Sequence, residues 1–406
     1  MENQKTNYNI SKNFLGLNQM LWRKSALQRI RSLFFVIDSA ILLTLKKPKK
    51  KTGKKKVLIV YNMALGDGIM FYGVSQYLRE IWPTEQYELT IACQKAFKDL
   101  YIARGIYDKV LPLDFTGATI NLKKRRDLFR LLRSEHYDIL LDPVGSEECT
   151  TNVFVSRAAC SDKKIGVVNR ALPQQLSNKK RRSIYTDVIE LEQENMHLIQ
   201  YYAETMKRLG ANDCVASPAS LPDIKPPVKL PEKFFIVFPV ASMDVKKWDV
   251  KNYAYIARKI QEETGLPLVI CGTEHDRPSI EEMLSYIPDI TYVDVIGKTN
   301  IIEFTSVIGK AEYVVTNDTS AYHIAVARGV KTFMVCGGYT YDRYAHYQYA
   351  SLGYRDPYLI TKHMDCYNCN NHCIYNDFKV FPCIERVTKE DAWDVISHVI
   401  NEEQNV

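Results

Sequence analysis

The stretch AEYVVTNDTSAYHIAVARGVKTFMVCGG, residues 311–338, decides the fold. Residues 313–315 are a short aromatic and β-branched run, typical of a buried parallel strand, and residues 332–335 begin a second such run. Between them, residues 317–320 supply turn formers and an N-cap for a helix. The pattern therefore predicts strand, polar turn, helix and strand, with its reactive side chains gathered in the turn.

The turn carries the side chains Asp318, Thr319 and Ser320, and His323 follows one helical turn later. A helix N-terminus at the carboxyl edge of a sheet offers unpaired N–H groups and a positive dipole end, which suits phosphate. The alternative is that Asp318 only caps the helix and that His323 is a partly buried helix residue.

Length and charge narrow the class of protein. A chain of 406 residues predicts two domains, and a net charge of +7 is concentrated in residues 46–56, which hold eight lysines and no acid. Because the rest is near neutral, the composition argues against nucleic-acid binding. Ten cysteines without a recognisable signal peptide predict a reducing, cytoplasmic location.

Residues 1–56 are predicted to be an N-terminal extension. The apolar run at residues 33–45 contains Asp38 and is too short to span a bilayer, but basic residues flank it on both sides. We therefore expect residues 20–56 to contact an anionic membrane surface, at the inner face of the cytoplasmic membrane. The alternative is a helix packed on the protein's own surface, followed by a flexible basic linker.

From residue 57 the chain alternates strands and helices, which predicts an α/β fold with parallel sheets. Five prolines in residues 217–233 break the series, and the run at residues 234–239 restarts it. We predict two Rossmann-like domains, residues 57–216 and 234–406, facing each other across a cleft, with residues 217–233 as the linker.

Each predicted domain has a charged segment after its first strand. In the first domain Asp67 lies between Gly66 and Gly68, where it is placed like a general base, although a plain turn is the better explanation of these three residues taken alone. In the second domain Lys246 and Lys247 precede a tryptophan, and an ammonium group here could hold a diphosphate. A surface lysine pair is the alternative.

Together these segments resemble family 9 of the glycosyltransferases, the heptosyltransferase family, over about residues 56–397. The resemblance rests on the following motifs: Gly66-Asp67, Lys246-Lys247-Trp248, Asp318-Thr319-Ser320-Ala321-Tyr322-His323, and Gly297-Lys298-Thr299 with Glu303. It implies the two-Rossmann GT-B fold and an inverting, metal-independent transfer from a nucleotide-diphospho-sugar to a saccharide or lipid-linked glycan. No Asp-x-Asp motif is apparent in the sequence.

The resemblance also implies residue roles. Asp67 would be the catalytic base, with Gly66, Gly68 and Tyr72 on the acceptor side. Lys246 would contact the donor phosphates and Asp318 the donor sugar. The other residues expected at the donor are Lys247, Thr319, Ser320 and His323.

The sequence departs from the family pattern at three places. Ser320 replaces a glycine, Phe71-Tyr72 replaces Thr-Pro after the first turn, and Asp249 replaces a proline. Two alternatives to transfer therefore stay open. One is a nucleotide-sugar epimerase, and the other is a catalytically silent scaffold in polysaccharide assembly.

The segment at residues 363–383 is rich in cysteine. Cys366, Cys369, Cys373 and Cys383 have a spacing that permits a structural zinc site, with His363 and His372 as spare ligands. The alternative is a group of reduced thiols, or disulfides formed on purification.

Overall fold

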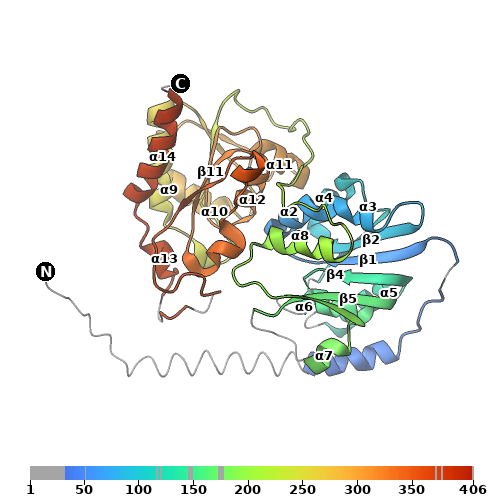
Figure 1. Ribbon diagram of the computed structural model, residues 1–406. Helices are drawn as coiled ribbons and strands as arrows, with labels where there is room; N and C mark the ends of the chain where they lie inside the picture. Colours follow the sequence, from blue (N-terminus) through green and yellow to red (C-terminus); the bar gives the residue numbers. More distant parts are fainter. Residues whose placement is uncertain are drawn as a thin grey trace.

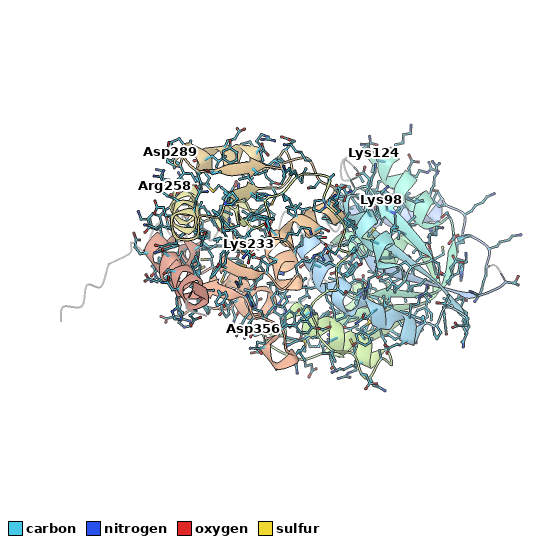
Figure 2. All side chains as sticks on the ribbon, turned by 90° about the horizontal axis from the view of Figure 1, so that it is seen from above. Lys98, Lys124, Lys233, Arg258, Asp289 and Asp356 are labelled. Carbon is cyan, nitrogen blue, oxygen red and sulfur yellow. The ribbon has the colours of Figure 1, made fainter. Side chains whose placement is uncertain are left out.

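The structure is a computed structural model, and it describes residues 33–50, 52–115, 118, 121–144, 150–171, 178–370, 373–375 and 378–404. Residues 1–32 of the predicted extension lie outside these ranges, as does His372. The described chain forms two α/β units, which Figure 1 shows side by side. Charged side chains such as Lys98 and Lys124 of one unit, and Arg258 and Asp289 of the other, lie on the outside (Figure 2).

The first unit is a parallel sheet of six strands in the order β3-β2-β1-β4-β5-β6. The strands are β1 (Lys55–Tyr61), β2 (Tyr87–Gln94), β3 (Lys109–Leu113), β4 (His136–Asp142), β5 (Cys160–Asn169) and β6 (Asp187–Leu191). Residues 57–60 of β1 are fully buried, because apolar layers cover both faces of the sheet.

Helices form those covering layers. One face of the sheet packs on α2 (Leu65–Val74) and α8 (Leu198–Arg208), and the other packs on α5 (Leu122–Leu132) and α6 (Thr150–Ala158). The remaining elements are α3 (Leu78–Ile81), α4 (Lys98–Arg104), α7 (Asn178–Arg182) and the 3-10 turns Ser75–Tyr77 and Lys95–Phe97.

The second unit repeats this arrangement, in the order β12-β11-β10-β7-β8-β9. Its strands are β7 (Phe235–Phe238), β8 (Leu268–Ile270), β9 (Tyr292–Asp294), β10 (Tyr313–Thr316), β11 (Lys331–Val335) and β12 (Tyr358–Ile360). Its helices are α9 (Val250–Thr264), α10 (Arg277–Ser285), α11 (Ile301–Ile308), α12 (Ser320–Ala327), α13 (Pro382–Glu385) and α14 (Lys389–Gln404). In both sheets the strand order reverses next to the first strand, and ligands of such folds bind at that point. The predicted fold class, two Rossmann-like domains, is confirmed.

One detail differs from the expected elements. Gly66, Asp67 and Gly68 lie in the first turn of α2 rather than in a turn before it, since the N–H of Gly68 already donates to the carbonyl of Ala64. Asp67 is therefore held by a helix end. The 3-10 turn Ser75–Tyr77 separates α2 from α3.

The two units pack on each other through α2 and α12, which lie together in the middle of Figure 1. Buried side chains of both helices share one apolar cluster, which includes Phe71 from α2 and Tyr322 from α12. Each of these helices begins at the carboxyl edge of its own sheet. The contact therefore brings the two edges together.

The chain between the units is anchored at both ends. On the side of the first unit, a Cβ built on Gly73 of α2 would lie 2.8 Å from the carbonyl oxygen of Ser217. On the side of the second unit, the Arg328 guanidinium donates to the carbonyl of Leu221 at 3.1 Å and to that of Pro222. Ser220, between these contacts, is exposed.

Residues 33–43 form a helix that lies against the outer side of α5 and α6. Its apolar residues Ile41 and Leu42 pack on the same cluster as Phe154 of α6. Among the described residues, no helix is both long and apolar enough to cross a membrane.

Candidate functional site at the facing edges of the two sheets

The centre of the site is a half-buried charge pair in the second unit. The Lys246 ammonium donates to Oδ2 of Asp318 at 2.8 Å, and the Tyr339 hydroxyl donates to the same oxygen at 2.7 Å. The ammonium also lies 4.8 Å from the centroid of the Tyr339 ring. Burial would raise the pKa of Asp318, but the charge and hydrogen bond of Lys246, with help from His323 and Tyr339, lower it below its usual range. Asp318 is therefore ionised.

Local structure holds this pair in place. Lys246 ends the 3-10 turn Asp244–Lys246 that follows β7, and Asp318 follows β10, the strand paired with β7. The buried Asn317 side chain accepts from the N–H of Trp248 at 3.0 Å, so the two loops are joined. The Trp248 indole is buried and donates to the carbonyl of Val387 at 2.7 Å.

Helix α12 begins beside the pair. Thr319 is its N-cap but makes no side-chain capping bond, and Thr319 and Ser320 are both half-buried. The N-terminal N–H groups of this eight-residue helix thus point toward the Asp318 region without a side-chain cap.

His323 links the second unit to the first. Its Nδ1 lies 2.8 Å from the Tyr347 hydroxyl, and its ring stands so close to α2 that a Cβ built on Gly66 would lie 2.6 Å from Cδ2. Burial lowers the pKa of His323 to about 4; the nearby Asp318 carboxylate opposes this shift, while Lys246 adds to it. The imidazole is therefore neutral near pH 7.

Asp67 lies in the first unit, one residue after Gly66, and is half-buried. Its backbone carbonyl accepts from the Tyr61 hydroxyl at 2.7 Å, and Tyr61 shares a 2.8 Å hydrogen bond with Tyr202. Burial raises the pKa of Tyr347, and Tyr349 and the carboxylates of Asp67 and Asp318 raise it further.

Not every predicted residue joins this site. The Lys247 ammonium pairs with the exposed Asp244 at 2.8 Å. Tyr72 is buried on α2 beneath the Arg104 guanidinium, 4.6 Å from its ring centroid. Gly68 faces the Tyr101 hydroxyl, 3.1 Å from where its Cβ would be.

Three contributing tyrosines were not predicted from the sequence: Tyr339, Tyr347 and Tyr61. A signal existed for Tyr339, because it follows two glycines at the end of a predicted strand. Nothing local marks Tyr347, which reaches the site from beyond the π-helix Tyr341–Ala345.

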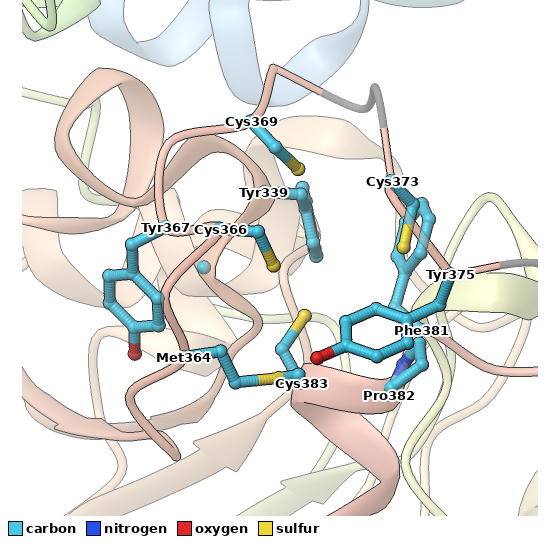
Figure 3. Close-up of a pocket in the computed structure, with 11 residues that line it drawn as sticks. Tyr339, Met364, Cys366, Tyr367, Cys369, Cys373, Tyr375, Phe381, Pro382 and Cys383 are labelled. Atoms are coloured by element: carbon cyan, nitrogen blue, oxygen red, sulfur yellow. The ribbon is translucent and has the colours of Figure 1, made fainter. Parts of the chain in front are cut away.

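The cysteine-rich segment forms a separate pocket. Cys366, Cys369, Cys373 and Cys383 line it together with aromatic and apolar side chains that include Tyr339 and Phe381 (Figure 3). Figure 3 shows the thiols of Cys366 and Cys383 pointing toward each other. Among the residues that the structure describes, no three His, Cys, Asp or Glu side chains lie close enough together to hold a metal ion.

The fold and this site define a two-domain α/β protein. The N-terminus of α12 in one domain can bind phosphate, and the Asp67 carboxylate belongs to the other domain, on the far side of the domain contact. Residues 125–355, more than half of the chain, match the family described as glycosyltransferase family 9 (heptosyltransferase). The chain belongs to that family.

A curated relative and solved structures are consistent with this assignment. The chain is 28% identical over 110 residues to the lipopolysaccharide core heptosyltransferase OpsX of Haemophilus influenzae, a match that spans 27% of this chain and only 30% of that relative. A family 9 glycosyltransferase structure from Veillonella parvula has a TM-score of 0.67 at 14% identity, with 87% of this chain and 100% of that chain covered. The Escherichia coli heptosyltransferase WaaC, solved with ADP-2-deoxy-2-fluoro heptose, has a TM-score of 0.60 at 14% identity, with 86% and 99% covered.

Proposed function

We propose that the protein is an inverting glycosyltransferase that moves a heptose or related sugar from a nucleotide-diphospho-sugar to a saccharide or lipid-linked glycan of the cell surface. One observation carries the proposal: the Lys246-Asp318 pair beside the N-terminus of α12 and Asp67 in the first turn of α2 lie on the two sides of the contact between these helices. Membership of family 9 supports it.

We assign the chemistry to Asp67 as the base that removes the proton of the acceptor hydroxyl. Inversion needs one displacement at the anomeric carbon, and therefore one base on the side opposite the leaving group. Asp67 comes from the first unit and Asp318 from the second, so a donor held by the second unit would present its sugar between them.

The leaving diphosphate gains negative charge as the glycosidic bond breaks. Lys246 and the N–H groups at the start of α12, with Thr319 and Ser320, would stabilise that charge. Asp318 would accept hydrogen bonds from the sugar. We expect no metal requirement for this step, as the family resemblance implies.

We propose an ADP-linked sugar as the first donor to test, because WaaC was solved with an ADP-linked heptose analogue. A lipopolysaccharide-core-like acceptor is the corresponding choice, from the printed name of the Haemophilus relative. Such acceptors are membrane-bound, and we propose that the protein works as a peripheral protein at the cytoplasmic face, with residues 20–56 on the anionic surface.

The test combines donor binding with transfer. Thermal unfolding should be shifted upward by one of ADP, GDP, UDP and CDP, since a ligand at 100 times its Kd adds about 2.7 kcal/mol. Asp67→Asn should then abolish transfer from the matching nucleotide-sugar while its affinity for the nucleotide stays within about twofold. Asp99→Asn, at an exposed position on α4, is the matched control and should keep both properties.

Other outcomes favour the alternatives. Nucleotide-sugar turnover without any acceptor would favour an epimerase. Donor binding without hydrolysis or transfer would favour a silent scaffold. Equal loss of binding and transfer in Asp67→Asn would contradict the base assignment.

We also propose a structural zinc ion at the four-cysteine pocket. Four thiolates are a donor set that zinc prefers, but the four sulfurs would have to move closer together than they are in the described residues. Purified protein should contain one zinc per chain by elemental analysis, and Cys383→Ser should lose it. Cys160→Ser, outside this pocket, should keep it. Wild-type protein without zinc would refute the proposal.

A further inference from the structure

The helix at residues 33–43 has an inner face fastened to the first unit. Asp38 is 3% exposed and accepts from the guanidinium groups of Arg125, at 2.7 Å, and Arg157, at 3.4 Å. The Arg157 guanidinium also lies 3.4 Å from the centroid of the Phe35 ring. Arg133 donates to the carbonyl of Leu42 at 2.7 Å, which satisfies the end of the helix.

The opposite face of the same helix is apolar and exposed. Leu33, Val36 and Leu43 are 60%, 65% and 88% exposed, and Ala40 between them is exposed as well. Their spacing of three, four and three residues places all four on one stripe of the helix. A helix docked on a globular protein ordinarily turns polar residues outward, so this stripe calls for a partner.

Basic side chains follow this helix in the sequence and also lie beside it on α7. Lys46, Lys47 and Lys49 are exposed just after the helix, and α7 adds Lys179 and Arg182. Helix α7 lies beside residues 33–43 in Figure 1, and the Lys180 ammonium is 5.3 Å from the Phe35 ring centroid. Two segments about 130 residues apart in sequence thus form one surface, because the fold places them together.

Helix α6 connects this surface to the site. Its Arg157 holds Asp38, and its Asn152 accepts from the N–H of Asn62, directly after β1, at 2.9 Å. The two residues are five positions apart, or about 7.5 Å along a helix. The docked helix is therefore connected through α6 to the loop that leads into Asp67.

We propose that the stripe of Leu33, Val36, Ala40 and Leu43, with the basic residues beside it, binds an anionic lipid bilayer and fixes the orientation of the acceptor side toward that bilayer. A second copy of this chain is a poorer partner, because a twofold contact would set the basic cluster against itself. An anionic lipid surface matches both the apolar and the charged part. This inference deepens the proposed function. Bilayer binding by the stripe does not depend on that function, but the role of the stripe in orienting the acceptor side does.

Vesicle binding tests the surface without any donor or acceptor. The full chain is mixed with vesicles of phosphatidylcholine alone, or with phosphatidylglycerol added, and the bound fraction is measured by cosedimentation. We expect at least tenfold tighter binding to the anionic vesicles. The variant Leu33→Gln/Val36→Gln/Leu43→Gln should lose at least tenfold in affinity, as should Lys46→Gln/Lys47→Gln/Lys49→Gln.

The control is Ile102→Gln, which replaces a 58% exposed apolar residue elsewhere and should bind like the wild type. All substituted positions are exposed, so the thermal unfolding of each variant should match that of the wild type. Unchanged vesicle binding in the leucine and valine variant would overturn the proposal. So would a wild-type dimer in solution that the same variant converts to a monomer. Either result leaves transfer to a soluble acceptor unaffected, which separates it from failure of the proposed function.

Discussion

Gly66 of the first unit and His323 of the second are in direct apposition: a Cβ on the glycine would stand 2.6 Å from Cδ2 of the imidazole. The ring cannot turn away without losing the 2.8 Å contact of Nδ1 with the Tyr347 hydroxyl. The glycine in the Gly-Asp motif is thus required by the domain contact.

We therefore expect Gly66→Ala to lower the free energy of unfolding by about 1–3 kcal/mol, the usual cost of overpacking. The His323→Ala background should remove most of that cost, because it vacates the space. Urea unfolding of the four proteins in the cycle measures the coupling. Additive effects would show that the two residues do not meet.

The two adjacent lysines should behave differently. Lys246 pairs with the half-buried Asp318, whereas Lys247 pairs with the exposed Asp244. Loss of a charge-assisted hydrogen bond costs about 1.5–3 kcal/mol, so Lys246→Ala should weaken nucleotide-diphosphate binding by roughly 10- to 150-fold. Lys247→Ala is the matched control and should change it less than about threefold. Titration calorimetry of each variant, with the nucleotide that raises the thermal stability of the wild type, measures the two affinities. Equal losses of affinity in the two variants would assign Lys247 to the donor site as well.

Acid should destabilise the protein through two buried imidazoles. Burial lowers the pKa of His323 from 6.5 to about 4 and that of His197 to about 3. The unfolded chain therefore binds more protons as the pH falls below 6.5, and the free energy of unfolding should fall by up to about 1.4 kcal/mol per pH unit for each histidine. Urea unfolding between pH 7 and 5 measures this slope.

The contribution of one histidine is separable. His323→Asn should reduce the slope between pH 7 and 5, and His398→Asn, on the exposed side of α14, should leave it unchanged. If the slope stayed the same in both variants, the pKa of His323 in the folded protein would not be lowered.

Asp38 should matter for stability more than surface acids do. Asp38→Ala leaves the Arg125 and Arg157 guanidinium groups without their shared carboxylate, and breaking such a buried pair costs about 3–5 kcal/mol. Asp127→Ala removes an exposed pair with Arg130 and should cost less than about 0.5 kcal/mol. Chemical unfolding measures the loss in free energy of unfolding for each variant. Similar losses would mean that the helix at residues 33–43 does not pack against Arg125 and Arg157 in solution.

Much of the fold followed from local pattern. The continuous apolar runs that became β1 and β7, and the strand, turn and helix of residues 313–327, carry their signal in a few neighbouring residues. Helix ends were less predictable. The motif Gly66-Asp67-Gly68 looks like a turn by composition, yet it is the first turn of α2, which the packing against α12 stabilises.

The site was predictable where motifs carried it. Lys246 and Asp318 were named from sequence, and the structure pairs them. Lys247 could not be separated from Lys246, because which of two neighbours faces inward depends on the 3-10 turn Asp244–Lys246. Tyr347 reaches His323 only through tertiary folding, so no local pattern reveals it.

The anchored connection between the two units limits how they can separate. Ser217 is packed on Gly73, and Leu221 and Pro222 are held by Arg328, so the covalent pivot is confined to the few residues around Ser220. A pivot this short allows one unit to rotate relative to the other but does not allow it to translate away. Admission of a nucleotide-sugar would then proceed by rotation that parts Gly66 from His323, and the same rotation reversed would restore their contact after release.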